Sequence, residues 1–172
     1  MQAVFIDRDG TIIEEVNYLS NFNELKIFNF TFDAIKILKN LNFKIIIITN
    51  QSGIARGYFT QEFVENVNNY LCKTLGIDDF FYCPHLPDDN CICRKPKIGL
   101  IKNVLKKYPE INLKKSFFIG DKEVDIETGI NSGTNTILVQ TGYGKKEANN
   151  SKADFIVKNV YYASLLIQGI VK

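Results

Sequence analysis

Short apolar runs in the sequence alternate with segments whose apolar residues recur at helical spacing. Three runs, 3–7, 44–49 and 116–120, each end in a polar or glycine-containing turn, which is typical of buried parallel strands. Residues 136–139 and 154–157 are two further strand candidates. The pattern therefore predicts at least five strands.

The segments between and after these strands predict helices. They span 30–41, 61–75, 100–108 and 124–131, and a last helix begins near residue 160. Thr60 offers a hydroxyl N-cap for the second helix and Gly76 can close it, whereas Pro109 prevents continuation of the third. The predicted elements thus alternate between strand and helix.

This alternation is typical of an α/β fold. We expect a Rossmann-like three-layer sandwich, with a central parallel sheet, helices on both faces and right-handed crossovers. At 172 residues the chain is long enough for one well-buried domain, and it has no internal repeat or low-complexity linker. We therefore expect a single domain over residues 1–172.

Composition and charge restrict the class of protein. Hydrophobic residues make up 45% and charged residues 23% of the chain, as in ordinary globular proteins, and a net charge of +2 does not favour nucleic acid as a partner. The longest aliphatic run, 45–48, is too short to cross a bilayer, and the N-terminus lacks the basic region of a secretory signal. We expect a cytoplasmic monomer that binds neither nucleic acid nor membrane.

Two aspartates follow the first predicted strand. In extended backbone, residues two apart point to the same side, so Asp7 and Asp9 can converge on one small volume. Mg²⁺ would relieve the repulsion between the two carboxylates, one of which could act as a nucleophile and the other as an acid or base. An isolated Asp-x-Asp pair is also typical of an Asx-turn at a strand end.

Polar groups at two other strand ends favour the chemical interpretation of this pair. Thr49 and Asn50 end the second predicted strand, and Asp121 follows the strand 116–120. In open α/β sheets, ligands bind at the carboxyl ends of the strands. Thr49 and Asn50 offer donors to phosphate oxygens. Lys95 offers a positive charge, and Asp121 offers a further carboxylate to Mg²⁺.

A second cluster lies within the segment 83–93. It contains the only histidine and three of the four cysteines of the chain, namely Cys83, His85, Cys91 and Cys93. Thiolates and an imidazole at this spacing predict a structural Zn²⁺ site with all four positions filled by protein. A disulfide between Cys91 and Cys93 would close a tiny strained ring. Arg94 and Lys95 follow directly, so zinc would fix the direction in which both cations point.

The segment Asp7-Arg8-Asp9-Gly10-Thr11 resembles the first motif of the haloacid dehalogenase phosphatases, and the resemblance covers nearly the whole chain. It implies that Asp7 attacks phosphorus and that Asp9 protonates the leaving oxygen and then activates water. It also implies that Thr49 and Lys95 hold the phosphoryl group. The implied magnesium ligands are Asp7, the backbone carbonyl of Asp9, and Asp121.

Asp125 lies four residues after Asp121, a spacing that fits one helical turn near the metal. We expect this carboxylate to orient a water or Lys95 from behind the magnesium ligands. A surface carboxylate without a role is the alternative.

Three further stretches resemble the D-glycero-D-manno-heptose 1,7-bisphosphate 7-phosphatases: residues 50–57, the zinc cluster with Arg94-Lys95-Pro96, and Gly120-Asp121-Lys122. This resemblance implies a cytoplasmic enzyme of bacterial nucleotide-activated heptose synthesis without a large cap domain. It places substrate contacts at Glu15, Val16, Asn17, Tyr18, Thr49, Asn50, Gln51, Ser52, Arg94, Lys95 and Lys122. Arg56 adds positive charge suited to a second phosphate.

Two alternatives remain open. The five-residue spacer between His85 and Cys91 resembles histidinol-phosphatase domains, but the ammonium group of histidinol phosphate would favour carboxylates, whereas Arg56 and Lys122 suit a second phosphate. The other alternative is a non-catalytic zinc-binding interaction module. Against it stands the complementary set Asp7, Asp9, Thr49, Lys95 and Asp121.

Overall fold

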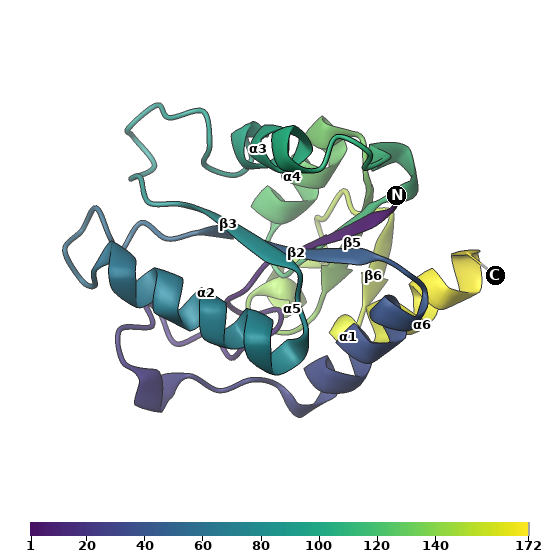
Figure 1. The fold of residues 1–172 in the computed structure, drawn as a ribbon, viewed down its shortest axis with the longest axis horizontal. Coiled ribbons are helices and arrows are strands. Elements are labelled where there is room, and N and C mark those ends of the chain that lie inside the picture. The colour runs from purple at the N-terminus through teal and green to yellow at the C-terminus, as the bar shows by residue number, and fades with distance from the viewer. Residues whose placement is uncertain (172) are drawn as a thin grey trace.

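A computed structural model describes residues 1–171 (Figure 1). The strands are β1 (Ala3–Ile6), β2 (Lys44–Asn50), β3 (Asp79–Cys83), β4 (Phe117–Gly120), β5 (Asn135–Val139) and β6 (Phe155–Val157). The helices are α1 (Asn29–Asn40), α2 (Gln61–Leu75), α3 (Gly99–Lys107), α4 (Glu123–Ser132), α5 (Gly144–Glu147) and α6 (Val160–Val171), with the 3-10 turns η1 (Phe22–Glu24) and η2 (Leu113–Lys115). The five predicted strands and five predicted helices are confirmed to within a few residues.

The boundaries of two helices follow the signals in the sequence. Thr60 accepts a hydrogen bond from the Phe63 N–H at 3.1 Å, and Gly76 ends α2 in a left-handed conformation with φ 76°. The α3 helix ends at Lys107, two residues before Pro109. Within residues 1–171, no helix combines the length and apolar character that a membrane span requires.

The β3 strand is the largest element that the sequence pattern does not predict. It pairs in parallel with β2, from Ile46 opposite Asp79 to Asn50 opposite Cys83. Four of its five residues are only half-buried, because β3 forms an edge of the sheet and is covered less completely than the central strands. The single turn of α5 is also unpredicted, since four residues are too few to show helical periodicity.

The six strands form one parallel sheet in the order β3-β2-β1-β4-β5-β6. Strand order reverses between β1 and β4, because β2 and β3 lie on one side of β1 while β4, β5 and β6 lie on the other. The connections that leave the two central strands therefore diverge and open a crevice at their carboxyl ends. This arrangement confirms the expected Rossmann-like sandwich.

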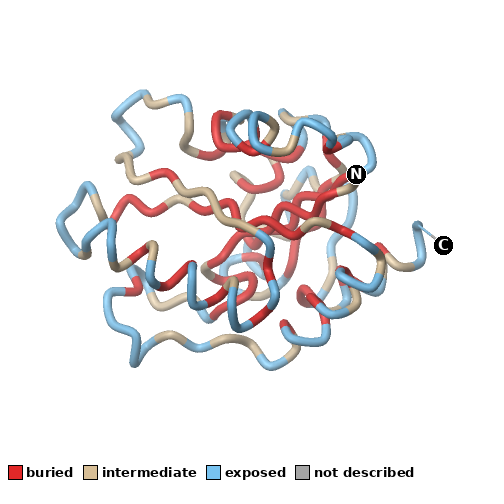
Figure 2. The backbone as a smooth tube through the Cα atoms, in the orientation of Figure 1, coloured by how far each residue is buried: buried red, intermediate tan, exposed pale blue. Residues whose placement is uncertain are grey.

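Alternate residues of β1 pack into two separate layers of core. Val4 and Ile6 belong to the layer that contains buried residues of α1, α2 and α6, whereas Ala3 and Phe5 pack with α3. Figure 1 shows α3 and α4 on one face of the sheet and α1, α2 and α6 on the other, and Figure 2 shows buried residues concentrated along the strands between them. The N-terminus and the end of α6 at Val171 both lie away from the carboxyl ends of the strands (Figure 1).

Candidate active site

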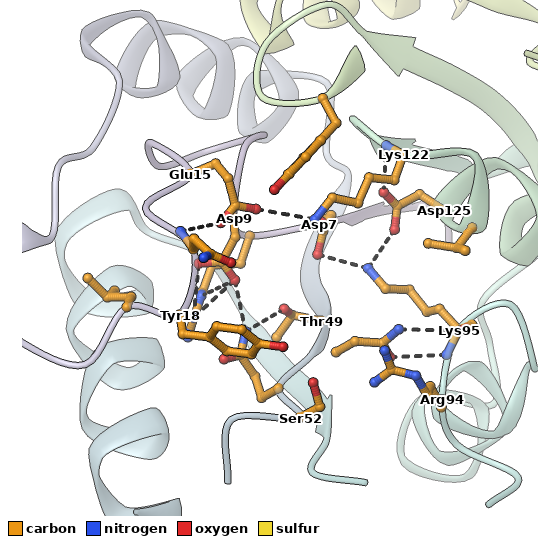
Figure 3. A pocket seen from close by; sticks show the side chains of 17 residues that line it. Asp7, Asp9, Glu15, Tyr18, Thr49, Ser52, Arg94, Lys95, Lys122 and Asp125 are labelled. Carbon is orange, nitrogen blue, oxygen red and sulfur yellow. Dashed lines mark hydrogen bonds and ion pairs between the residues drawn. The ribbon is translucent and has the colours of Figure 1, made fainter. Parts of the chain in front are cut away.

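A cavity of about 400 Å³ lies at the carboxyl ends of the central strands. Strand pairing continues to its edge, since the Asp7 N–H donates to the Ile119 carbonyl at 2.9 Å. The side chains that line the cavity come from segments far apart in sequence (Figure 3). They are Asp7, Arg8, Asp9, Glu15, Asn17, Tyr18, Leu19, Thr49, Asn50, Gln51, Ser52, Arg94, Lys95, Lys122, Val124, Asp125 and Tyr143.

Three residues predicted for the site do not line this cavity. Val16 packs against the apolar core, Arg56 is exposed near the rim, and Asp121 is fully buried. Four lining residues were not predicted from the sequence, namely Arg8, Leu19, Val124 and Tyr143. Of these four residues, only Arg8 could have been predicted from the sequence, because it lies between the two aspartates that follow a buried strand.

Lys95 lies between two carboxylates. Its Nζ is 2.8 Å from Asp7 Oδ1 and 2.6 Å from Asp125 Oδ1, and it donates to the Ile48 carbonyl at 2.8 Å. All three charged side chains are buried. Burial alone would lower the pKa of Lys95, but Asp125 and Asp7 outweigh it and raise that pKa. Lys95 is therefore a stable cation beside Asp7, where it can attract a phosphate.

The carboxylate of Asp121 has one oxygen without a protein donor. Its Oδ2 accepts from the Tyr143 N–H at 2.8 Å, whereas buried Oδ1 has no hydrogen-bond partner within residues 1–171. Burial, together with Asp7 and Asp125, raises the pKa of Asp121 to about 8. Ligand oxygens of these three aspartates lie within 4.8 Å of one another. The group fits Mg²⁺, because Lys95 alone cannot balance three carboxylates, and a hard dication would supply the remaining positive charge.

Two glycines let the backbone close on Asp121. Gly10 has φ 79° and Gly142 has φ 51°, both in the left-handed region that favours glycine. A Cβ atom at either position would collide with Asp121 Oδ2. The Asp121 carboxylate thus lies in a pocket of backbone that only glycine at these two positions permits.

Asp9 is held by two neighbouring side chains. Arg8 donates from Nε to Asp9 Oδ2 at 3.1 Å and from Nη2 to Oδ1 at 3.0 Å. Gln51 Nε2 donates to Asp9 Oδ2 at 2.8 Å and to Thr49 Oγ1 at 2.9 Å. In Figure 3, Asp9 lies to one side of Asp7, with Lys95 and Asp125 to the other. Asp7 therefore has the Asp9 carboxylate on one side and the ion pair of Lys95 and Asp125 on the other.

Asn50 links the end of β2 to the backbone of Lys95. The Lys95 N–H donates to Asn50 Oδ1 at 3.1 Å, and Asn50 Nδ2 donates to the Lys95 carbonyl at 3.3 Å. This pair of hydrogen bonds resembles that between adjacent strands. The Asn50 amide therefore positions the Lys95 backbone, and Asn50 also lines the cavity, where its predicted contact with substrate stays a prediction.

The four predicted zinc ligands converge at the carboxyl end of β3. Cys83 Sγ lies 3.5 Å from His85 Nδ1, 3.6 Å from Cys91 Sγ and 3.1 Å from Cys93 Sγ. His85 Nδ1 is 3.2 Å from Cys93 Sγ. Ligand atoms around tetrahedral Zn²⁺ are about 3.5–3.8 Å apart, so only a small expansion is needed. Burial and Cys93 raise the pKa of the Cys83 thiol, and a dication at the centre would favour the thiolate instead.

Two interactions bridge the mouth of the cavity. Lys122 Nζ lies 3.2 Å from Glu15 Oε2, and Glu15 Oε1 accepts from the Asn17 N–H at 2.8 Å. Farther along the same loop, the Tyr18 ring meets the Tyr58 ring edge to face at 4.9 Å. The loop after β1 is thereby connected to the start of α4 and to the segment before α2.

Arg56 lies beside Tyr18, a residue that lines the cavity. Its guanidinium carbon is 5.9 Å from the centre of the Tyr18 ring, and its side chain is exposed. Arg94 lines the cavity and donates from Nη1 to the His85 carbonyl at 3.1 Å, which ties it to the zinc cluster. The two arginines therefore approach the cavity from different segments.

Comparisons with known proteins agree with this geometry. Residues 2–165 match the family model described as polynucleotide kinase 3 phosphatase. The chain is 36% identical over 181 residues to D-glycero-alpha-D-manno-heptose-1,7-bisphosphate 7-phosphatase of Photorhabdus laumondii, with 98% of this chain and 97% of that protein covered. It is 40% identical over 147 residues to the D-glycero-beta-D-manno-heptose-1,7-bisphosphate 7-phosphatase of Helicobacter pylori strain 26695, with 81% and 84% covered.

A solved structure extends the similarity to three dimensions. The D,D-heptose 1,7-bisphosphate phosphatase from B. bronchiseptica, complexed with magnesium and phosphate, superposes with a TM-score of 0.90. The two chains are 26% identical, and the match covers 99% of each. Together with the aspartates at the strand ends and the cavity where strand order reverses, these similarities show that the chain belongs to the heptose-1,7-bisphosphate 7-phosphatases of the haloacid dehalogenase superfamily.

Proposed function

We propose that this chain is a Mg²⁺-dependent phosphatase that removes the 7-phosphate of D-glycero-D-manno-heptose 1,7-bisphosphate. The observation that carries the proposal is the position of Asp7, which pairs with buried Lys95 and forms an acidic group with Asp121 and Asp125. This carboxylate faces a cavity large enough for a sugar phosphate. Relatives named for this substrate align with nearly the whole chain.

In the proposed reaction, a carboxylate oxygen of Asp7 attacks phosphorus and the bond to the sugar oxygen breaks. The leaving oxygen takes a proton from Asp9, and Asp7 retains the phosphoryl group as an aspartyl phosphate. Water then attacks phosphorus and gives its proton to Asp9, so that the bond to Asp7 breaks and phosphate leaves. Thr49 and Lys95 hold the phosphoryl oxygens through both steps.

The acidic group would hold Mg²⁺ through Asp7, Asp121 and the backbone carbonyl of Asp9. When bound there, the cation would neutralise phosphate charge that Lys95 alone cannot balance. Asp125 lies against Lys95 and has its own backbone partner, since its Oδ2 accepts from the Lys122 N–H at 3.1 Å. We therefore assign Asp125 to orienting Lys95.

The remote phosphate needs its own cations, because a sugar bisphosphate carries up to about four negative charges. We assign Arg94, Lys122 and Arg56 to it, since all three lie at the cavity wall or its rim. Glu15, Asn17 and Tyr18 would then face the sugar from the loop after β1. Asn50, Gln51 and Ser52 also line the cavity and complete the proposed substrate contacts.

The cluster of Cys83, His85, Cys91 and Cys93 would hold a structural Zn²⁺, because four protein ligands leave no position for substrate. Its role would be to fix the segment that carries Arg94 and Lys95. We further propose that the protein acts as a single-domain monomer in the cytoplasm, without a nucleic acid or membrane partner.

The test compares catalytic efficiency on three substrates in the presence of Mg²⁺. Heptose 1,7-bisphosphate should exceed heptose 7-phosphate by about 10²-fold or more, because binding of the remote phosphate orients the reacting one. Histidinol phosphate should be poorer still. Equal efficiency on both heptoses, or faster hydrolysis of histidinol phosphate, would contradict the proposed substrate.

A further inference from the structure

Arg8 is a buried charged side chain to which the proposed reaction gives no role. Its side chain is 2% exposed, and it is among the largest fully buried side chains of the protein. Burial of a guanidinium is costly unless its donors are paired. Two of its nitrogens face Asp9, as described above, and the third, Nη1, donates to Asn68 Oδ1 at 3.2 Å. Arg8 therefore connects Asp9 to the α2 helix.

Asn68 is unusual on its face of α2. It is fully buried, and its buried neighbours on that helix are mostly apolar, including Val64, Val67 and Leu71. Its Nδ2 has no hydrogen-bond partner within residues 1–171, so the amide costs stability compared with an apolar side chain of the same shape. Among the described residues, Arg8 is the hydrogen-bond partner of this side chain. Packing alone does not explain an asparagine at this position.

We propose that Arg8 is a positioning residue for Asp9, and that Asn68 anchors Arg8. Two nitrogens of the Arg8 guanidinium donate to the two oxygens of the Asp9 carboxylate and so fix its orientation. A single hydrogen bond would leave the carboxylate free to rotate. Gln51 restrains the same carboxylate from β2. Asn68 keeps the guanidinium from turning away, because it holds the remaining nitrogen.

This inference rests on the proposed function, in which Asp9 serves both steps of the reaction. A displaced Asp9 would slow protonation of a sugar oxygen in the first step and activation of water in the second. An aryl phosphate such as 4-nitrophenyl phosphate needs no proton for its leaving group. With that substrate, loss of Asp9 positioning should leave the first step fast and slow only hydrolysis of the aspartyl phosphate.

The experiment measures nitrophenolate release on the millisecond scale by Arg8→Met, Asn68→Leu and Asp9→Asn, with Mg²⁺ present. Arg8→Met keeps the length of the side chain without its donors, and Asn68→Leu keeps the shape of the amide without its acceptor. Each should release up to about one equivalent per chain at the wild-type rate and then continue about 10²-fold more slowly than wild type. Val67→Ala is the matched control, because it removes buried volume from the same helix face without removing a hydrogen bond.

The outcomes separate this inference from the proposed function. A shared burst in all three variants, absent from Val67→Ala, supports the positioning role, and circular dichroism identifies any variant that fails to fold. A burst in Asp9→Asn alone overturns the role of Arg8 and Asn68 but leaves the reaction intact. The positioning role is also overturned if Arg8→Met and Asn68→Leu lose the burst and the steady-state phase together. A burst in Val67→Ala would overturn it as well. Wild-type turnover by Asp9→Asn would contradict the proposed reaction itself.

Discussion

Arg94 donates a hydrogen bond to the carbonyl of His85, so a cation of the cavity wall and a residue of the zinc cluster hold each other in place. Only Nη1 takes part in this bond, and the rest of the guanidinium remains available to a phosphate. Arg94→Ala should therefore reduce the preference for heptose 1,7-bisphosphate over heptose 7-phosphate by about tenfold or more.

The same variant should affect hydrolysis of 4-nitrophenyl phosphate much less, because that substrate has no second phosphate to bind. Steady-state kinetics on the three substrates measure the difference, and zinc content controls for damage to the cluster. A uniform loss on all three substrates would show that Arg94 acts on the reacting phosphate or on folding instead.

Asp7→Asn should abolish turnover while the fold remains intact. An amide cannot form the acyl phosphate, so activity should fall by about 10³-fold or more. The variant removes an ion pair with Lys95, but it also removes repulsion between Asp7 and the carboxylates of Asp121 and Asp125. Because Asp125 still pairs with Lys95, we expect the fold to persist. Activity and circular dichroism together test this, and substantial turnover by a folded Asp7→Asn protein would exclude the covalent route.

Removal of the two metals should have different consequences. Mild chelation should remove Mg²⁺ and activity together, and both should return when Mg²⁺ is added. Stronger chelation that removes Zn²⁺ should lower Tm and loosen the segment from Cys83 to Lys95, because four converging ligands would lose their common partner. Elemental analysis beside thermal unfolding checks both parts, and a zinc-free protein with unchanged Tm would contradict the structural role.

Asp79→Asn should destabilise the protein at neutral pH but not in acid. Burial would raise the pKa of Asp79, but hydrogen bonds from Lys107, Tyr108 and the Phe80 N–H outweigh it and lower the pKa below its ordinary value of 3.8. The resulting stability is present above that pH and is lost as pH falls through the lowered pKa. Because the Lys107 side chain is 57% exposed and solvent screens its charge, the expected effect is about 1 kcal/mol or less.

Urea unfolding of the wild type and Asp79→Asn at a series of pH values measures this contribution. The two curves should differ at pH 7 and converge as the carboxylate of the wild type becomes protonated. An equal difference at both ends of the series would assign the effect to packing at the start of β3 rather than to charge.

Much of the fold could be predicted because local signals agree with tertiary structure. The apolar runs that became β1, β2 and β4 are buried on both faces of the sheet, and Thr60 and Gly76 occur where α2 begins and ends. The β3 strand gave a weaker signal. It has three aromatic residues in succession, but it lies at an edge and is only partly buried, so it lacks the aliphatic run that marks the central strands.

The sequence could predict which side chains form the site, from their chemistry and their positions at strand ends. It could not predict which residues hydrogen-bond to them. Asp7, Asp9, Asn50 and Lys95 were expected together, and they lie together around the cavity. The contacts of Asn50 with the Lys95 backbone and of Arg8 with Asn68 join residues 45 and 60 positions apart. Contacts of this kind depend on where loops and helices lie against the sheet, which periodicity does not specify.

The N-terminus and the end of α6 at Val171 lie away from the carboxyl ends of the strands (Figure 1), where the cavity lies. The protein is therefore suited to immobilisation through either end. A tag that attaches the N-terminus before β1 to a sensor surface would leave the cavity directed toward the solution, and a peptide fused after α6 would be equally remote. Binding of phosphate or a sugar bisphosphate could then be followed on the attached protein without the surface obstructing entry.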